Sequence, residues 1–566
     1  PDGTPFYCGT YFPPRPVGGM ASFTQLLDAI HGAWQQDRDR VLSSADSLGD
    51  ALARAAADAA AGGTAEIDPG LPDRALDRLA QSFDPAHAGF GGAPKFPPST
   101  VLLWLLRHHA RTGRTEALDL TERTCEAMAR GGMYDQVAGG FARYSVDAEW
   151  VVPHFEKMLY DNALLLRTYT HLYRADGSPT ARRVAEETAE WMLAELRTEE
   201  GGLASSLDAD SEGAEGTYYV WTPDQLVEVL GEDDGARAAE VWSVTPRGTF
   251  EHGTSVLQLR EDPADADWYA RVRATVARAR ADRVPPARDD KVVVAWNAMA
   301  ATALAEAGAL LDRPEWVSAA EEVLALLLRV HGTGPGRLVR TSRGGVAGPS
   351  PAVLEDYAHL AEALLTLYQV TGSVPYLRQA EAQLAVVREQ FLGTEAVHDT
   401  AADATDAALT RLGRPADPAD GPTPAGASQA AAAFLGYAAL TGSPEHREAA
   451  LRCLAGPLGL AGEHPRATGS ALAVLEALLD GPREVAVVGA ADDPETVTLH
   501  TTALRSTAPG LVVALGHGQP DEDEVPLLRD RPRQDGRPTA YVCRQMVCRL
   551  PTTDPDELAR QLARED

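Results

Sequence analysis

The stretch GGMYDQVAGGFARYSVDAEWVVPHFEKMLYDN, residues 131–162, joins a glycine-rich loop to a dense run of polar and aromatic residues. It lies between two predicted helices, 116–130 and 154–175, in which apolar residues recur every three or four positions. The glycines permit an irregular loop, and Pro153 suits the first turn of the second helix. A helix that begins there places His154, Lys157 and Asp161 on one face.

The polar side chains of this loop are of the kinds that bind polyols. Sugars require planar polar groups for their hydroxyls and an aromatic face for their C–H groups, and a histidine with carboxylates supplies acid and base. The same charges would also suit a structural ion network, with Arg143 paired to Asp147 and Glu156 to Lys157. Both interpretations stay open on the sequence alone.

Three further polar segments, 205–221, 288–297 and 354–359, recur along the chain as loops around one mouth would. The acidic loop in the first imitates a calcium loop, but Tyr219 stands where a bidentate Glu is required, so we expect no metal site. The expected catalytic residues are His154, Glu156, Asp208, Asp210 and Asp356. The expected substrate-binding residues are Arg143, Tyr144, Trp150, Lys157, Tyr160, Asp161, Trp221, Lys291, Trp296, Asn297 and Tyr357.

Helical patterns follow one another from residue 71 to about 480, with glycine- and proline-rich loops between them. About a dozen helices with long loops at alternate connections suit a toroid of helical hairpins. Residues 1–60 hold a predicted strand, Phe6–Phe12, and a predicted helix, 20–60, and residues 61–70 form a linker. Residues 481–566 read as a small α/β segment with strands at 484–489, 511–515 and 539–543 and a helix at 493–507.

Composition narrows the function classes. The chain has 566 residues and a net charge of −31, which argues against a nucleic-acid partner, and no apolar run is long enough to cross a membrane. Five cysteines cannot form a disulfide scaffold, Cys543 and Cys548 make at most half a metal site, and we expect them to be small residues on a final strand. A cytoplasmic protein without a cofactor is the simplest expectation, and its oligomeric state is left open.

Lysine and asparagine are rare, which marks the positions that keep them. The chain has 48 arginines but only three lysines, and only two asparagines. Lys157 and Asn162 fall in one short segment, and Lys291 and Asn297 in another. Arginine cannot copy a compact ammonium, and few residues copy an amide's donor and acceptor, so these positions are constrained. The constraint fits either function or core hydrogen bonding.

The chain resembles the thioredoxin-domain-containing proteins of the spermatogenesis-associated protein 20 type, including bacterial YyaL-like members. The matching runs are PFYCGTYFPP at 5–14, 89–97, 131–161, 206–221, 289–297, 354–358 and 541–548. The resemblance implies a mainly α fold, an (α/α)6 barrel similar to six-hairpin glycosidases and N-acylglucosamine 2-epimerases, after a thioredoxin-like domain. Residues 1–60 match only the last strand and helix of that domain, so we expect no dithiol chemistry from this chain.

Three functions follow as alternatives. The first is a barrel that binds or converts a carbohydrate-like small molecule, either as an epimerase, with His154 and His359 as candidate acid and base, or as a glycosidase with two carboxylates. The second is a thiol-redox protein whose barrel presents a substrate to a thioredoxin domain. The third is a non-catalytic binding or scaffold module, whose mouth would hold only paired charges.

Overall fold

Six inner helices form a closed ring in the computed structural model, which describes residues 4–59, 64–334, 336–394, 396–406, 413–517 and 525–563. Each inner helix contacts the next, and the last contacts the first. In ring order they are α4 (Ser99–Thr112), α6 (Leu159–Asp176), α11 (Val294–Leu310), α13 (Leu354–Thr371), α16 (Gly426–Thr441) and α18 (Gly469–Asp480). The inner helices are buried on nearly every side, as α11 shows by exposing almost none of its side chains.

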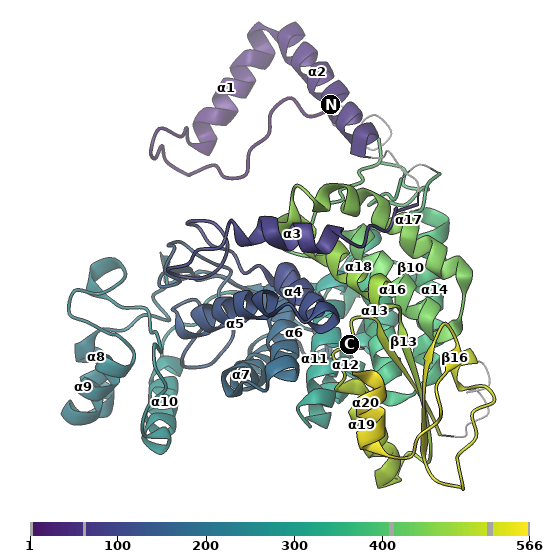
Figure 1. Ribbon diagram of the computed structural model, residues 1–566. Helices are drawn as coiled ribbons and strands as arrows, with labels where there is room; N and C mark the ends of the chain where they lie inside the picture. Colours follow the sequence, from purple (N-terminus) through teal and green to yellow (C-terminus); the bar gives the residue numbers. More distant parts are fainter. Residues whose placement is uncertain are drawn as a thin grey trace.

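An outer helix precedes each inner helix along the chain, which completes six pairs. The outer helices are α3 (Leu71–Ala80), α5 (Thr115–Arg130), α7 (Pro179–Glu195), α12 (Pro314–Leu326), α14 (Val374–Gln390) and α17 (Pro444–Ala461). They pack outside the ring against the inner helices. The alternation of outer and inner helices around a closed ring is the predicted (α/α)6 toroid, which is therefore confirmed (Figure 1).

Tight turns join inner to outer helices at one end of the ring. Gly113, Gly177, Gly372 and Gly442 each end an inner helix in the left-handed conformation, which glycine adopts without steric cost. A serine then caps two of the following outer helices. Because these turns are short, they offer few side chains for a site. The long connections, from outer to inner helices, lie at the opposite end of the ring.

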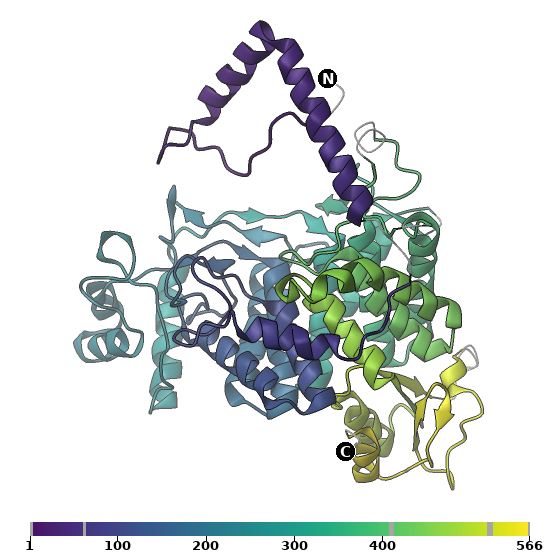
Figure 2. The same cartoon turned by 45° about the horizontal axis from the view of Figure 1, so that its top comes forward.

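The long connections carry short strands to the N-termini of the inner helices. Strands β1–β8 lie between residues 144 and 293, and β9–β12 between 332 and 347. Figure 2 shows them on the side of the ring that faces residues 4–59, which we call the N-terminal arm. A helical insertion, α8 (Pro223–Leu230), α9 (Glu232–Val241) and α10 (Ala266–Ala281), packs around its own apolar cluster beside this mouth.

Two predicted elements near the mouth and the N-terminus are wrong. Residues 153–158 do not begin the helix, because Pro153 and His154 pair with β1 (Tyr144–Ser145) as β2, and Lys157 pairs with Leu207. His154, Lys157 and Asp161 therefore do not share a helix face. The Phe6–Phe12 strand does not form, since no described strand pairs with it, and the 20–60 helix is divided into α1 (Phe23–Gln36) and α2 (Arg38–Ala59).

The C-terminal segment closes the turn end of the ring. Strands β13 (Arg483–Val488), β14 (Leu511–Gly516), β15 (Thr539–Arg544) and β16 (Val547–Cys548) form one sheet in the order β14-β13-β15-β16. One face packs on α19 (Pro494–Leu504) and α20 (Pro555–Leu562), and the other on the ring. The predicted βαβ unit is confirmed, but Cys543 and Cys548 face each other across β15 and β16 and form a disulfide, contrary to expectation.

Of the described helices, none combines the length and apolar character that crossing a bilayer demands.

Asparagine side chains fix the long connections to the inner helices. Asn297 accepts a hydrogen bond from the Leu203 N–H at 2.8 Å and donates to the Leu203 carbonyl at 3.0 Å. Asn162 holds Phe141 in the same way, at 2.7 and 3.0 Å. Both asparagines are fully buried and are the fourth residue of their helix. The rarity of asparagine in this chain therefore marks a structural clasp.

Asn297→Ala should lower the free energy of unfolding by about 2–4 kcal/mol, because both backbone groups of Leu203 lose their buried partner. Chemical denaturation measures the change, with Asp290→Ala at the surface as the matched control, expected within about 0.5 kcal/mol of wild type. A loss below about 1 kcal/mol for Asn297→Ala would contradict the clasp.

Candidate functional site

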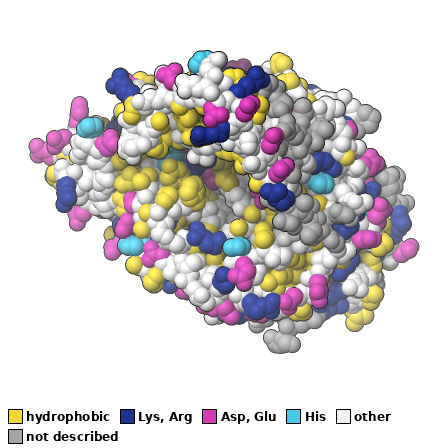
Figure 3. Space-filling view, turned by 90° about the horizontal axis from the view of Figure 1, so that it is seen from above, with side chains coloured by type: hydrophobic (Ala, Val, Ile, Leu, Met, Phe, Trp, Pro, Cys, Tyr) yellow, Lys and Arg dark blue, Asp and Glu magenta, His cyan; other side chains and the backbone are white. Residues whose placement is uncertain are grey.

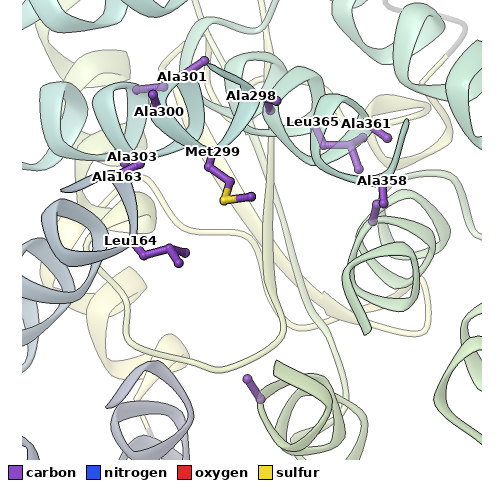
Figure 4. Packing of buried hydrophobic residues seen from close by; sticks show 14 of the residues in the cluster. Ala163, Leu164, Ala298, Met299, Ala300, Ala301, Ala303, Ala358, Ala361 and Leu365 are labelled. Carbon is purple, nitrogen blue, oxygen red and sulfur yellow. The ribbon is translucent and has the colours of Figure 1, made fainter. Parts of the chain in front are cut away.

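A cavity of about 50 Å³ lies on the axis of the ring, below the N-termini of the inner helices. Figure 4 shows Leu164 and Met299 pointing toward this space from neighbouring helices. Every inner helix contributes to the wall, with Thr100, Leu164, Met299, Glu362, Gln429 and Val474 as one residue from each. Because the wall comes from the most rigid part of the fold, its side chains are well fixed.

One charged network spans the cavity. Arg167 donates to both oxygens of Glu306, at 2.8 and 2.9 Å, and to Glu362 at 2.9 Å. Gln429 donates to the other oxygen of Glu362 at 2.6 Å, and His171 Nε2 lies 2.9 Å from Glu306. Burial opposes ionisation of Glu306, but the charge of Arg167 holds its pKa below the ordinary value. The network is therefore a charged, fully formed polar surface inside an apolar ring.

His359 stands beside this network with no hydrogen bond at either ring nitrogen among the described residues. It is 1% exposed, and its nearest charged neighbour is Glu362, with Nδ1 4.0 Å from the carboxylate. Burial lowers the pKa of His359 to about 4, so the imidazole is neutral at pH 7. A neutral imidazole that lines a cavity with both nitrogens free is able to accept a proton from a ligand.

A second cavity of about 180 Å³ lies deeper on the same axis. It shares Arg107, Arg167, Glu362, Ala432 and Val474 with the first, so the two are levels of one axial site. The C-terminal residues 507–512 line its far side. Figure 3, which views the molecule from the side of the N-terminal arm, shows a hollow with hydrophobic and charged side chains at its rim.

Seven of the residues expected in the site do meet at the mouth. Arg143 donates to Glu156 at 3.0 Å, the Tyr144 ring stacks on His154 at 5.1 Å, and Tyr160 meets Trp296 edge to face at 4.9 Å. The seventh is Asp161, whose buried carboxyl has one oxygen without a hydrogen bond in the described structure. The mouth thus joins aromatic faces to charged groups, as expected for a polyol.

The charges of the mouth are largely paired. The Glu156 carboxylate and then Glu215, 2.7 Å from His154 Nδ1, raise the pKa of His154. His154 in turn lowers the pKa of Glu156. Burial raises the pKa of Asp161 well above its ordinary value, the opposite direction from that of Glu156. His154 and Glu156 therefore stabilise each other's charged form.

Other expected residues are placed in the framework. Lys157 makes a buried ion pair with Asp135 at 2.9 Å, and Asn297 forms the clasp on Leu203. Asp356 is fully buried, and its oxygens accept from the N–H groups of Ala295 and Val353 and from Arg340.

The remaining expected residues lie in the framework or at the rim. Trp150 donates to the His87 carbonyl at 3.0 Å, and Tyr357 accepts from the Leu338 N–H at 3.0 Å. Trp221 belongs to the core of the helical insertion. Asp208 and Asp210 are exposed, and Lys291 pairs with Asp289 at a half-exposed position. None of these residues lines the axial cavity.

Of the residues that line the axis, His359 was expected in the site, but the charged network around Arg167 was missed, although the sequence carries a signal for it. On α6, Arg167, His171 and Arg174 recur at helical spacing and lie on one face of a largely buried helix. Glu306 on α11 interrupts an almost wholly apolar helix in the same way. A charge inside a helix that is apolar all round indicates an internal polar site.

Comparison with known proteins finds one family model and several full-length relatives. Residues 1–53 match the model of the Thioredox_DsbH family, described as a protein of unknown function, DUF255. Spermatogenesis-associated protein 20 of Homo sapiens is 28% identical over 99% of this chain and 78% of its own length. The chain is thus similar to spermatogenesis-associated protein 20 over almost its whole length. Another relative, the uncharacterized protein B0495.5 of Caenorhabditis elegans, is 26% identical over 99% of this chain and 82% of its own.

Solved structures with a similar arrangement include a D-mannose isomerase and an unsaturated glucuronyl hydrolase specific for heparin. The first is 10% identical, with a TM-score of 0.45 over 69% of this chain and 86% of its own. The second is 12% identical, with a TM-score of 0.43 over 76% and 96%. The fold assignment for this chain is based on its own closed ring of helices.

Acid should destabilise the protein through His359. Its pKa falls from about 6.5 in the unfolded chain to about 4 in the fold. Above pH 6.5 both states are neutral, and as the pH falls toward 4 the unfolded chain takes up a proton that the folded chain excludes. The free energy of unfolding should therefore decrease by about 3 kcal/mol through this group across that window.

His359→Gln should flatten the pH dependence between pH 6.5 and 4, measured by denaturant unfolding at several pH values. The control is His31→Gln, at an exposed position on α1. Its free energy of unfolding should depend on pH as steeply as that of wild type. An unchanged slope in His359→Gln would show that the imidazole is not excluded from protonation.

Proposed function

We propose that this protein binds a carbohydrate-like polyol in the axial cavity, with the mouth as the entrance. The observation that carries the proposal is the network of Arg167, Glu306, Glu362 and Gln429, which presents fixed donors and acceptors inside an enclosed, otherwise apolar ring. Such groups replace the water that surrounds hydroxyls, and apolar walls such as Met299 cover C–H faces. Tyr160 and Trp296 supply the aromatic surface at the entrance.

The chemistry of the cavity favours proton transfer at carbon over glycoside hydrolysis. Hydrolysis requires a carboxylic acid whose pKa is raised so that it can protonate the leaving oxygen. Glu306 has a lowered pKa, and both Glu306 and Glu362 are held by Arg167. A neutral base is present instead in His359. If the ligand is converted, His359 takes a proton from one carbon and returns it to the sugar, as an epimerase or isomerase requires, and the Glu362 carboxylate 4.0 Å from Nδ1 stabilises the imidazolium that forms between the two transfers.

A panel of neutral mono- and disaccharides, assayed by thermal shift, tests the binding. At least one sugar should raise the melting temperature of wild type, because a ligand that binds only the folded state stabilises it. Gln429→Leu should reduce the affinity about tenfold, since a polar contact in the cavity is lost. Gln379→Leu, on the outer helix α14, is the matched control and should bind like wild type.

His154→Ala separates the mouth from the axis. If the ligand contacts only the axial cavity, His154→Ala should show the same ligand-induced rise in melting temperature as wild type. If the ligand also contacts the mouth, His154→Ala should show a smaller rise. NMR of the sugar in D2O detects epimers or exchange at carbon, which His359→Gln should abolish. No shift with any neutral or acidic sugar would refute the proposed function and leave a non-catalytic scaffold as the better account.

A further inference from the structure

The deep end of the axial cavity has more positive than negative charge. Three arginines line it, Arg107, Arg167 and Arg174, against the two carboxylates of Glu306 and Glu362. Arg167 uses both carboxylates, which leaves Arg107 and Arg174 without an ion pair among the described residues. This positive surplus lies inside a protein whose net charge is −31.

Weak contacts alone hold the two remaining arginines. Arg107 donates to the Ala473 carbonyl at 3.3 Å. Arg174 donates to the Leu504 carbonyl at 3.4 Å and lies 3.4 Å from His171, and its buried Nε has no hydrogen bond in the described structure. Both arginines are half-buried, so their guanidinium groups have lost part of their hydration without gaining a counter-ion from the described residues.

No other described group at this end supplies the missing negative charge. Burial, with the positive charge of Arg174, lowers the pKa of His171 to about 4, so that ring is neutral at pH 7. Glu476, whose charge also acts on Arg107, makes its ion pairs with Arg111 and His108 instead. Burial beside like charges lowers the pKa of Arg174 to about 10, the direction expected for a cation that lacks a partner.

We propose that the deep end of the axial cavity is an anion subsite, in which Arg107 and Arg174 bind the carboxylate or phosphate group of an acidic sugar. Both guanidinium groups line one cavity of about 180 Å³, together with the polar residues Thr366, Gln369 and Thr507, and planar guanidinium groups bind carboxylates and phosphates through paired N–H donors. That the anion belongs to a sugar rests on the proposed function, whereas the anion subsite itself does not.

Inorganic phosphate alone is the first probe, added to the full chain at low ionic strength and followed by thermal shift and calorimetry. Wild type should be stabilised. Arg107→Gln and Arg174→Gln should each weaken phosphate binding at least tenfold while folding as well as wild type, because each removes an uncompensated charge. Arg182→Gln, at an exposed position on α7, is the matched control. Arg174→Lys, which keeps the charge, should bind more weakly than wild type and more tightly than Arg174→Gln.

Glucose, glucuronate and glucose 6-phosphate then separate the sources of the anion. Tighter binding of either acidic sugar than of glucose, lost in Arg107→Gln, supports the inference and names the group. A phosphate shift that both variants retain means an adventitious ion only and overturns it, as does the absence of any anion binding. Binding of glucose without any anion binding would support the proposed function and overturn the anion subsite. Binding of phosphate without any sugar binding would support the anion subsite and contradict the proposed function.

Discussion

The closure of six inner helices into a ring is the constraint on which the rest of this structure depends. Each inner helix is covered by two neighbours and an outer helix, so it must be apolar on nearly every side. The one direction left for a polar side chain is the axis. Arg167, Glu306 and Glu362 meet there and neutralise one another, whereas Glu476 is neutralised between α18 and α4 by Arg111 and His108.

The two ends of the closed ring have different structures. Tight glycine turns at one end leave a flat surface, which the C-terminal sheet covers and so gives the axial cavity a floor. The other end receives every long connection, and these connections need anchoring of their own. Asn162, Asn297 and Asp356 supply it by holding backbone groups of neighbouring segments. The anchored loops at the mouth and the C-terminal residues 507–512 at the other end therefore both contribute to the walls of the axial site.

Sequence patterns predicted the helices of the ring because the outer helices have an apolar face and the inner helices are long apolar runs between loops. The short apolar runs at 484–489 and 511–515 predicted the α/β character of residues 481–566. Sequence patterns failed at residues 153–158, where two-residue strands are fixed by partners far along the chain such as Leu207. They also missed the Cys543–Cys548 disulfide, because a spacing of five does not show that two strands bring the sulfurs together. The mouth cluster was predicted in part, since its residues lie close together in sequence.

The axial residues escaped prediction for a compositional reason. Lysine and asparagine are so rare here that each survivor stands out, and two of the conspicuous survivors, Lys157 and Asn297, satisfy buried groups of the framework. Arginine and glutamate are common in this chain, so Arg167 and Glu306 have no such mark. A rare residue type identifies positions where the local geometry admits only that residue, as in a side chain that holds a backbone segment. A ligand site is better identified by a charged residue in a helix that is buried on every side.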